Sequence, residues 1–205
     1  MSSLDDYPLS RSPIGELTLA TARLHLRPLA AGDRDDFIHM ERVSMAHLAP
    51  WEPTPRAGID PGEWFERWLA RSEEARALGL GLSFAATLRS GPGHGRLVGL
   101  FSLNNIVRGV YQNADAGWRV SAEFIGRGLG SEGVTGLLDL AFGPLNLHRV
   151  QANIQSSNVA SLKVAQKCGF RSEGLARSML HIAGRWCDHV MHAKLAGEHA
   201  GAAST

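Results

Sequence analysis

The chain has 205 residues and a mass of 22.1 kDa, a length typical of one domain. Its 44% of hydrophobic and 20% of charged residues are typical of a globular protein that buries a core. The formal net charge of +1 argues against a protein held to nucleic acid mainly through phosphate contacts, and no nucleic-acid partner is expected.

The first half of the sequence predicts one strand followed by two helices. Leucines alternate in "RLHLRPL" (23–29), which indicates a strand. A helix can begin at Asp33 and is broken by the prolines of "APWEPTP" (49–55). Asp60 suits an N-cap and Pro61 the first helical position, so a second helix is expected there.

Strands dominate the next part of the chain. The stretches 82–88, 96–107 and 114–120 have strand composition with turn residues between them, and we expect an antiparallel meander. Apolar residues at helical spacing over 134–142 then predict a helix with one buried face.

The C-terminal part predicts a strand at 148–154, a short helix from Asn158 that stops at Gly169, and two last strands. The whole order is β-α-α-β-β-β-α-β-α-β-β, an α/β (α+β) fold. We expect one domain over residues 16–196, between a mobile lead-in at 1–15 and a disordered tail at 197–205.

Three absences narrow the class of protein. Cys168 and Cys187 lack C-x-x-C spacing and a matching set of ligands, so neither a metal site nor a disulfide framework is expected. No apolar run approaches the ~20 residues of a membrane span, and no secretory signal is evident. We therefore expect a cytoplasmic protein without a membrane partner.

The glycines Gly128, Gly130 and Gly133 have the spacing G-x-G-x-x-G of a dinucleotide fingerprint. The strand before them carries Asp115 and Arg119, and no acid follows at the ribose-binding distance, which disfavours a Rossmann site. No lysine follows as in a Walker A loop. Two interpretations remain open: the glycines shape a tight turn, or a helix N-terminus binds a phosphate group.

Several separated motifs resemble the GNAT acetyltransferases. They are "IGRGLG" at the strand-to-helix junction, "LAPWEP", "NIVRG", "LHRVQA", "NVASLKVAQKCGFRSEG" and "GRWCDHV". Within that superfamily the chain is similar over 19–195 to the ribosomal-protein N-terminal acetyltransferases of RimJ/RimL type, nearest to the RimJ-like, alanine-specific branch. The resemblance implies a GNAT fold: a mixed, mostly antiparallel twisted sheet of about seven strands, splayed at the central ones.

The resemblance also implies acetyl-coenzyme A (acetyl-CoA) as co-substrate. Trp118, Arg119 and Val120 fall on the splayed strand whose backbone binds the pantetheine arm, and Asn158 falls at a position that contacts CoA, although it is also a good N-cap. The positions implied for the pyrophosphate are Gly126, Arg127, Gly128, Leu129, Gly130 and Ser131. Ile125 replaces the Q/R of the signature Q/R-x-x-G-x-G/A, a departure that leaves the backbone donors intact.

For the chemistry, the resemblance makes Ser161 the candidate acid that protonates the thiolate, because Ala165 stands where many relatives have a tyrosine. Ser161 also suits the first turn of a helix without any such role. The glutamates proposed as bases in related branches are replaced by Leu180 and Asn153.

The remaining carboxylates are Glu52, taken as a catalytic base or as a group that holds the substrate ammonium, and Asp115. The Asp188-His189 pair is an alternative source of a base, although a histidine on a strand is more often structural. Trp51, Asn105 and Asp115 are expected to border the acceptor amine.

A weak base is compatible with an α-amine acceptor. Such an amine titrates near 7.7–8.0, so roughly 10–15% is neutral at pH 7, against less than ~0.1% of a lysine side chain. The sequence thus predicts direct acetyl transfer to the N-terminal amine of a protein, a ribosomal protein of alanine type, by a monomer or homodimer. Acetylation of a small amine or amino-acid derivative, and a catalytically silent acyl-CoA-binding module, remain as alternatives.

Overall fold

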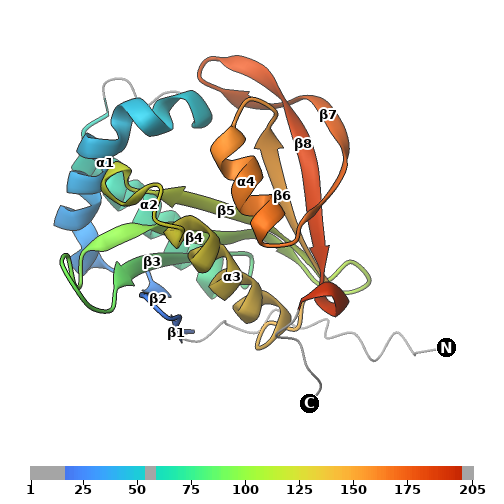
Figure 1. Ribbon diagram of the computed structural model, residues 1–205, viewed down its shortest axis with the longest axis horizontal. Coiled ribbons are helices and arrows are strands. Elements are labelled where there is room, and N and C mark those ends of the chain that lie inside the picture. Colours follow the sequence, from blue (N-terminus) through green and yellow to red (C-terminus); the bar gives the residue numbers. More distant parts are fainter. Residues whose placement is uncertain (1–16, 54–58, 200–205) are drawn as a thin grey trace.

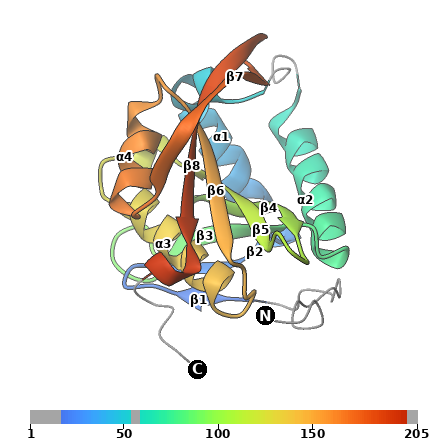
Figure 2. The same cartoon turned by 90° about the vertical axis from the view of Figure 1, so that its right-hand side faces the viewer.

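An eight-stranded sheet in the order β1-β2-β3-β4-β5-β6-β8-β7 crosses the molecule, with helices on both of its faces (Figures 1 and 2). The computed structural model describes residues 17–53 and 59–199. The expected lead-in at 1–15 and the tail from 200 onward lie outside the described residues.

The strands are β1 (Leu19–Ala20), β2 (Leu24–Pro28), β3 (Leu82–Leu88), β4 (Leu97–Val107), β5 (Asn113–Val120), β6 (Arg149–Gln155), β7 (Arg171–Ile182) and β8 (Arg185–Leu195). The α-helices are α1 (Arg34–Leu48), α2 (Pro61–Ala77), α3 (Leu129–Phe142) and α4 (Val159–Lys167). Short 3₁₀ turns are η2 (Ala31–Asp33), η3 (Ala49–Trp51), η4 (Ala122–Phe124) and η5 (Ala196–Glu198).

The expected order of helices and strands is confirmed, with one added strand. β1 has two residues and pairs antiparallel with β2, and a segment so short shows no periodicity in the sequence. The first residues of the expected tail are also folded. Glu198 forms an ion pair with Arg171 at 2.9 Å, and His199 contacts Asp139 at 2.6 Å, which fixes η5 against the domain.

Local signals explain the boundaries of α2 and α4. The Asp60 carboxylate accepts hydrogen bonds from the backbone N–H groups of Gly62 and Glu63 at 2.8 and 3.2 Å, which caps α2. Gly169 has φ +78° directly after α4, the left-handed conformation that commonly ends a helix.

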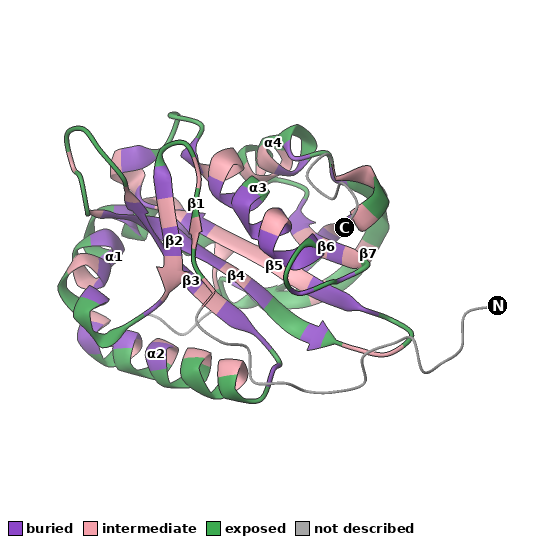
Figure 3. Ribbon diagram, turned by 90° about the horizontal axis from the view of Figure 1, so that it is seen from below, coloured by how far each residue is buried: buried purple, intermediate pink, exposed green. Residues whose placement is uncertain are grey.

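Two apolar cores lie on opposite faces of the sheet. Helices α3 and α4 cover a large core that includes Phe101 and Leu137, whereas α1 and α2 cover a smaller one around Phe37 and Phe65. The rings of Phe37 and Phe65 meet edge to face, with centroids 5.2 Å apart. In Figure 3 the exposed side of α2 is turned away from the sheet. None of the helices within the described residues is long and apolar enough to span a bilayer.

The sheet opens at its centre. β5 and β6 run parallel and pair only from Asn113 with Arg149 to Asp115 with Gln151, while all other neighbouring strands pair antiparallel. Beyond these pairs the two strands separate, so the backbone of β5 after Asp115 has no strand partner on the β6 side. This splay, expected from the resemblance, places a gap in the middle of the sheet.

Candidate active site

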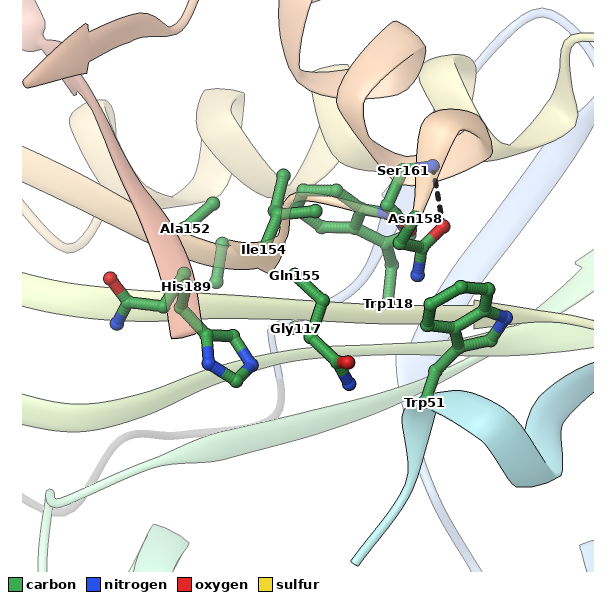
Figure 4. Close-up of a pocket in the computed structure, with 11 residues that line it drawn as sticks. Trp51, Gly117, Trp118, Ala152, Ile154, Gln155, Asn158, Ser161 and His189 are labelled. Atoms are coloured by element: carbon green, nitrogen blue, oxygen red, sulfur yellow. Dashed lines mark hydrogen bonds between the residues drawn. The ribbon is translucent and has the colours of Figure 1, made fainter. Parts of the chain in front are cut away.

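A cavity of about 160 Å³ lies at the splay of β5 and β6. Its walls come from η3, β5, β6, α4 and β8, and Figure 4 shows how these side chains face one another. The lining residues are Trp51, Ala116, Gly117, Trp118, Ala152, Asn153, Ile154, Gln155, Asn158, Ser161 and His189. The sequence-predicted residues Trp51, Trp118, Asn158 and Ser161 are therefore brought together.

The α4 wall is fixed by its own helix cap. Asn158 Oδ1 accepts a hydrogen bond from the Ser161 backbone N–H at 3.0 Å (Figure 4). The side-chain carbonyl of Asn158 is thus engaged, and the cap does not use the Ser161 hydroxyl. Trp118 packs on the same side of the sheet, with its ring centroid 6.5 Å from that of Phe170.

The β8 wall contributes His189, whose side chain is 3% exposed. Its Nδ1 lies 3.0 Å from the carbonyl oxygen of Cys187. Asp188, the other half of the Asp188-His189 pair considered as a source of a base, has a different partner, since its Oδ1 accepts from the backbone N–H of Ser178 at 2.7 Å. Side chains of adjacent residues on a strand point to opposite faces, which explains the difference.

Glu52 follows Trp51 but does not line the cavity. Its Oε1 lies 3.0 Å from Nη2 of Arg119, which also contacts Glu41 at 2.6 Å. The Arg119 side chain is buried and stacks over Trp68 at 5.3 Å, on the α1–α2 face. Only the backbone of Arg119 is therefore available to a ligand in the splay.

A backbone hydrogen bond holds the residue that follows Trp51, next to the cavity. Ala183, at the tip of the β7–β8 hairpin, donates its N–H to the carbonyl oxygen of Glu52 at 3.0 Å. The hairpin thereby joins the α1–α2 connection across the opening of the sheet.

Asp115 and Asn105 lie together but outside the cavity lining. Asp115 accepts from Asn105 Nδ2 at 2.8 Å and from Gln151 Nε2 at 3.1 Å. Gln151 in turn accepts from Arg149 Nε at 3.2 Å, and Arg149 pairs with Glu173. Asp115 thus belongs to a polar network at the closed end of the splay, where β5 and β6 still pair.

The N-terminus of α3 supplies open backbone donors next to β5. Gly128 is the N-cap with φ +76°, and no side chain caps the helix. The N–H groups of Leu129, Gly130 and Ser131 have no partner within the helix, because the first turn never does. Donors of this kind, with the helix dipole, suit a diphosphate.

Glu132, in the first turn of α3, is held by the turn between β1 and β2. It accepts from Thr21 Oγ1 and from the Arg23 backbone at 2.7 Å, and Arg23 Nη1 donates to the Arg127 carbonyl at 2.9 Å. Burial would raise the pKa of Glu132, but the hydrogen bonds from Thr21 and Arg23 outweigh it and hold the pKa below its usual value. The carboxylate thus stays charged and anchors the loop before the helix.

Among the residues that the structure describes, neither the buried thiol nor any group of side chains offers a metal site. Burial raises the pKa of the Cys168 thiol, which lies in the apolar core. Within the part of the chain that is described, no three His, Cys, Asp or Glu side chains gather as a metal site would require.

Sequence reasoning missed Gln155 and the face on which His189 lies. Gln155 pairs with His189 in the β6–β8 register, and both are buried at the cavity. The alternation of β6 places Val150, Ala152 and Ile154 in the larger core, which assigns Gln155 to the opposite face. That pattern could have identified Gln155, whereas the orientation of the His189 ring depends on a contact that no sequence pattern encodes.

The parallel central pair that diverges beside an uncapped helix N-terminus fits a coenzyme A-dependent acyltransferase. Residues 23–171 match the family model described as acetyltransferase (GNAT) domain. The chain belongs to the GNAT acetyltransferase family and is an acetyl-CoA-dependent N-acetyltransferase. Proteins of RimJ type are among those to which it is similar.

Curated relatives agree with this class. The Escherichia coli (strain K12) protein named [Ribosomal protein uS5]-alanine N-acetyltransferase is 28% identical over 184 residues, 89% of this chain and 93% of that protein. The Bacillus subtilis (strain 168) protein named "Probable N-acetyltransferase YjcK" is 40% identical over 100 residues, so the match spans 55% of that protein's length.

A solved structure described as Mycobacterium smegmatis RimJ in complex with CoA-disulfide superposes with a TM-score of 0.78. It is 28% identical and covers 85% of this chain and 83% of its own. The resemblance in the sequence is thus confirmed at the level of family and fold.

Proposed function

We propose that the enzyme transfers the acetyl group of acetyl-CoA to the N-terminal α-amine of a ribosomal protein that begins with alanine. The observation that carries this proposal is the end-to-end similarity to the E. coli [Ribosomal protein uS5]-alanine N-acetyltransferase, over 89% of this chain and 93% of that protein. Such a substrate is made in the cytoplasm, where we place the reaction.

The splay supports the proposed path of the coenzyme. The backbone of Trp118 and Val120 on β5 lies beside the gap and can bond to the pantetheine amides as a neighbouring strand would. The donors at Gly128–Ser131 follow directly after β5 and η4 in the chain, so one extended ligand can reach from β5 to the start of α3. Gly126 has φ +75°, and a Cβ there would meet no other atom within 4 Å, so this side of the loop is open to a ligand.

The reacting atoms then lie in the cavity. The amine attacks the thioester carbonyl, whose oxygen is stabilised by a β5 backbone N–H, and Ser161 protonates the departing thiolate. Asn158 holds the start of α4 in place and contacts the coenzyme through its remaining amide group.

The acceptor enters from the α1–α2 side. Trp51 forms a wall of the cavity, and Glu52, which pairs with Arg119, attracts the substrate ammonium at its rim. Asn105 and Asp115 bind the following residues of the peptide at the closed end of the splay. The free N-terminus of an extended peptide fits this path to the cavity better than a lysine within a folded chain.

The test is a comparison of acceptors. Purified enzyme is incubated with labelled acetyl-CoA and, separately, peptides that begin with alanine or serine, the same peptides with a blocked N-terminus, polyamines and free amino acids. Label on alanine-starting peptides that disappears on blocking supports the proposal. Label on free amines alone would reject the protein substrate, and CoA binding without any turnover would favour a silent module.

A further inference from the structure

His189 lies at the cavity in which we place the acetyl transfer. It lines the cavity together with Trp51, Asn158 and Ser161, and its side chain is almost fully buried. Figure 4 shows the imidazole on the wall opposite α4. The candidate acid and His189 therefore come from different elements and flank one cavity.

The hydrogen bond of His189 fixes its tautomer. Nδ1 lies 3.0 Å from the Cys187 carbonyl oxygen, and a carbonyl oxygen only accepts, so Nδ1 carries the proton. In the neutral ring Nε2 then holds a free lone pair. A ring held in this way has the tautomer and orientation that a general base needs.

Other groups near the cavity are less suited to take a proton. Glu52 and Asp115 do not line it, and each is engaged, Glu52 by Arg119 and Asp115 by Asn105 and Gln151.

Neither the preceding residue on β8 nor the paired residue on β6 presents a charge to His189. Asp188, its neighbour on β8, accepts from the Ser178 N–H. On β6, the paired residue is the uncharged Gln155. Among the described residues that line the cavity, His189 is the one histidine, and none of the others is a carboxylate or a lysine.

We infer that Nε2 of His189 is the general base of the acetyl transfer. As the amine nitrogen attacks, the new C–N bond forms and the nitrogen passes its extra proton to Nε2, directly or through a water molecule. The C–S bond then breaks and the sulfur gains a proton, while the imidazolium returns its own to solvent. The inference rests on the acetyl transfer proposed above, whichever amine accepts.

The chain provides a matched control in His192. It lies on the same strand, is also buried, and its Nδ1 makes the same contact, 3.0 Å from the Val190 carbonyl oxygen. His192 pairs with Ala152 and does not line the cavity. The variants His189→Asn and His192→Asn both keep an amide donor for the carbonyl and both lose the second ring nitrogen.

The first measurement is kinetic. We expect His189→Asn to lower kcat/KM at neutral pH by about 100-fold or more, within the range of a positioned base, and His192→Asn to change it less than about threefold. The loss should narrow as pH rises, since hydroxide can then take the proton from the attacking nitrogen in place of the imidazole. CoA affinity should stay near wild type in both variants. Equal activity of the two variants, or a loss independent of pH, would overturn the inference.

The second measurement does not need turnover. Long-range ¹H–¹⁵N NMR of the full chain labelled in histidine identifies the protonated ring nitrogen, with the His189 signals assigned by their absence in His189→Asn. A proton on Nδ1 of the neutral ring supports the inference, and a proton on Nε2 overturns it. If the wild-type protein binds CoA but acetylates none of the amines, the proposed function itself fails. If the wild-type protein is active and His189→Asn is equally active, only the role of His189 fails.

Discussion

Gly133 on α3 lies directly against the ring of Phe101 on β4, so that a methyl group on Gly133 would overlap ring atoms. The third glycine of the G-x-G-x-x-G spacing is therefore a packing residue between helix and sheet. Gly128 differs, because it needs a left-handed backbone as N-cap. A Cβ on Gly130 would lie 3.5 Å from Val120 and Val164, an ordinary contact.

Because the three glycines have different surroundings, substitutions at Gly133 and Gly130 should affect stability and CoA binding separately. Gly133→Ala should lower the free energy of unfolding by about 1–3 kcal/mol through overpacking and leave CoA affinity of the folded protein unchanged. Gly130→Ala should not lower stability, since alanine favours a helix by about 1 kcal/mol, but should weaken CoA binding where the diphosphate approaches the backbone. Urea unfolding and calorimetric titration with CoA measure the two effects. A stable Gly133→Ala variant would contradict the packing role.

The sequence predicted the helices, seven of the eight strands and the splayed pair because these follow from periodicity, caps and the resemblance. The sequence also indicated Trp51, Trp118 and Ser161, which line three different walls of the cavity. Partners that depend on tertiary contacts were not predictable. The alternation of β5 assigns Arg119 to a face, but its ion pairs with Glu41 and Glu52 arise only when α1 and η3 pack there. The same holds for Asp115, whose network with Gln151 forms across two strands distant in sequence.

The buried ion pairs of Arg119 should dominate the stability of the α1–α2 face. Arg119→Met leaves the buried Glu41 carboxylate without its guanidinium, and loss of one partner of a buried pair costs about 3–5 kcal/mol. Arg67 is the control, because its pair with Glu63 is exposed and Arg67→Met should change stability by less than about 0.5 kcal/mol. Urea unfolding compares the two, and equal losses would be inconsistent with this assignment.

Acid should weaken the attachment of α3 to the turn between β1 and β2. The pKa of Glu132 is lowered in the folded protein, so its stabilising effect is present above the ordinary carboxyl pKa, 4.5, and is lost as pH falls from there through the lowered value. Glu132→Gln removes this titration. We expect its unfolding free energy to be lower than that of wild type at pH 7 and to decline less steeply below pH 4.5. Parallel pH profiles of the two proteins would exclude Glu132 as a source of acid sensitivity.

Ser161 permits a clean test of the proposed acid, because the cap of α4 uses its backbone N–H and not its hydroxyl. Ser161→Ala should therefore fold with wild-type stability, whereas Asn158→Ala should lose about 0.5–2 kcal/mol with the cap. If the hydroxyl protonates the thiolate, Ser161→Ala lowers kcat by about 100-fold with CoA affinity unchanged. An acyl donor whose thiol has a lower pKa needs less protonation, so the deficit should shrink with such a donor. A Ser161→Ala enzyme with wild-type kcat would assign the proton to solvent instead.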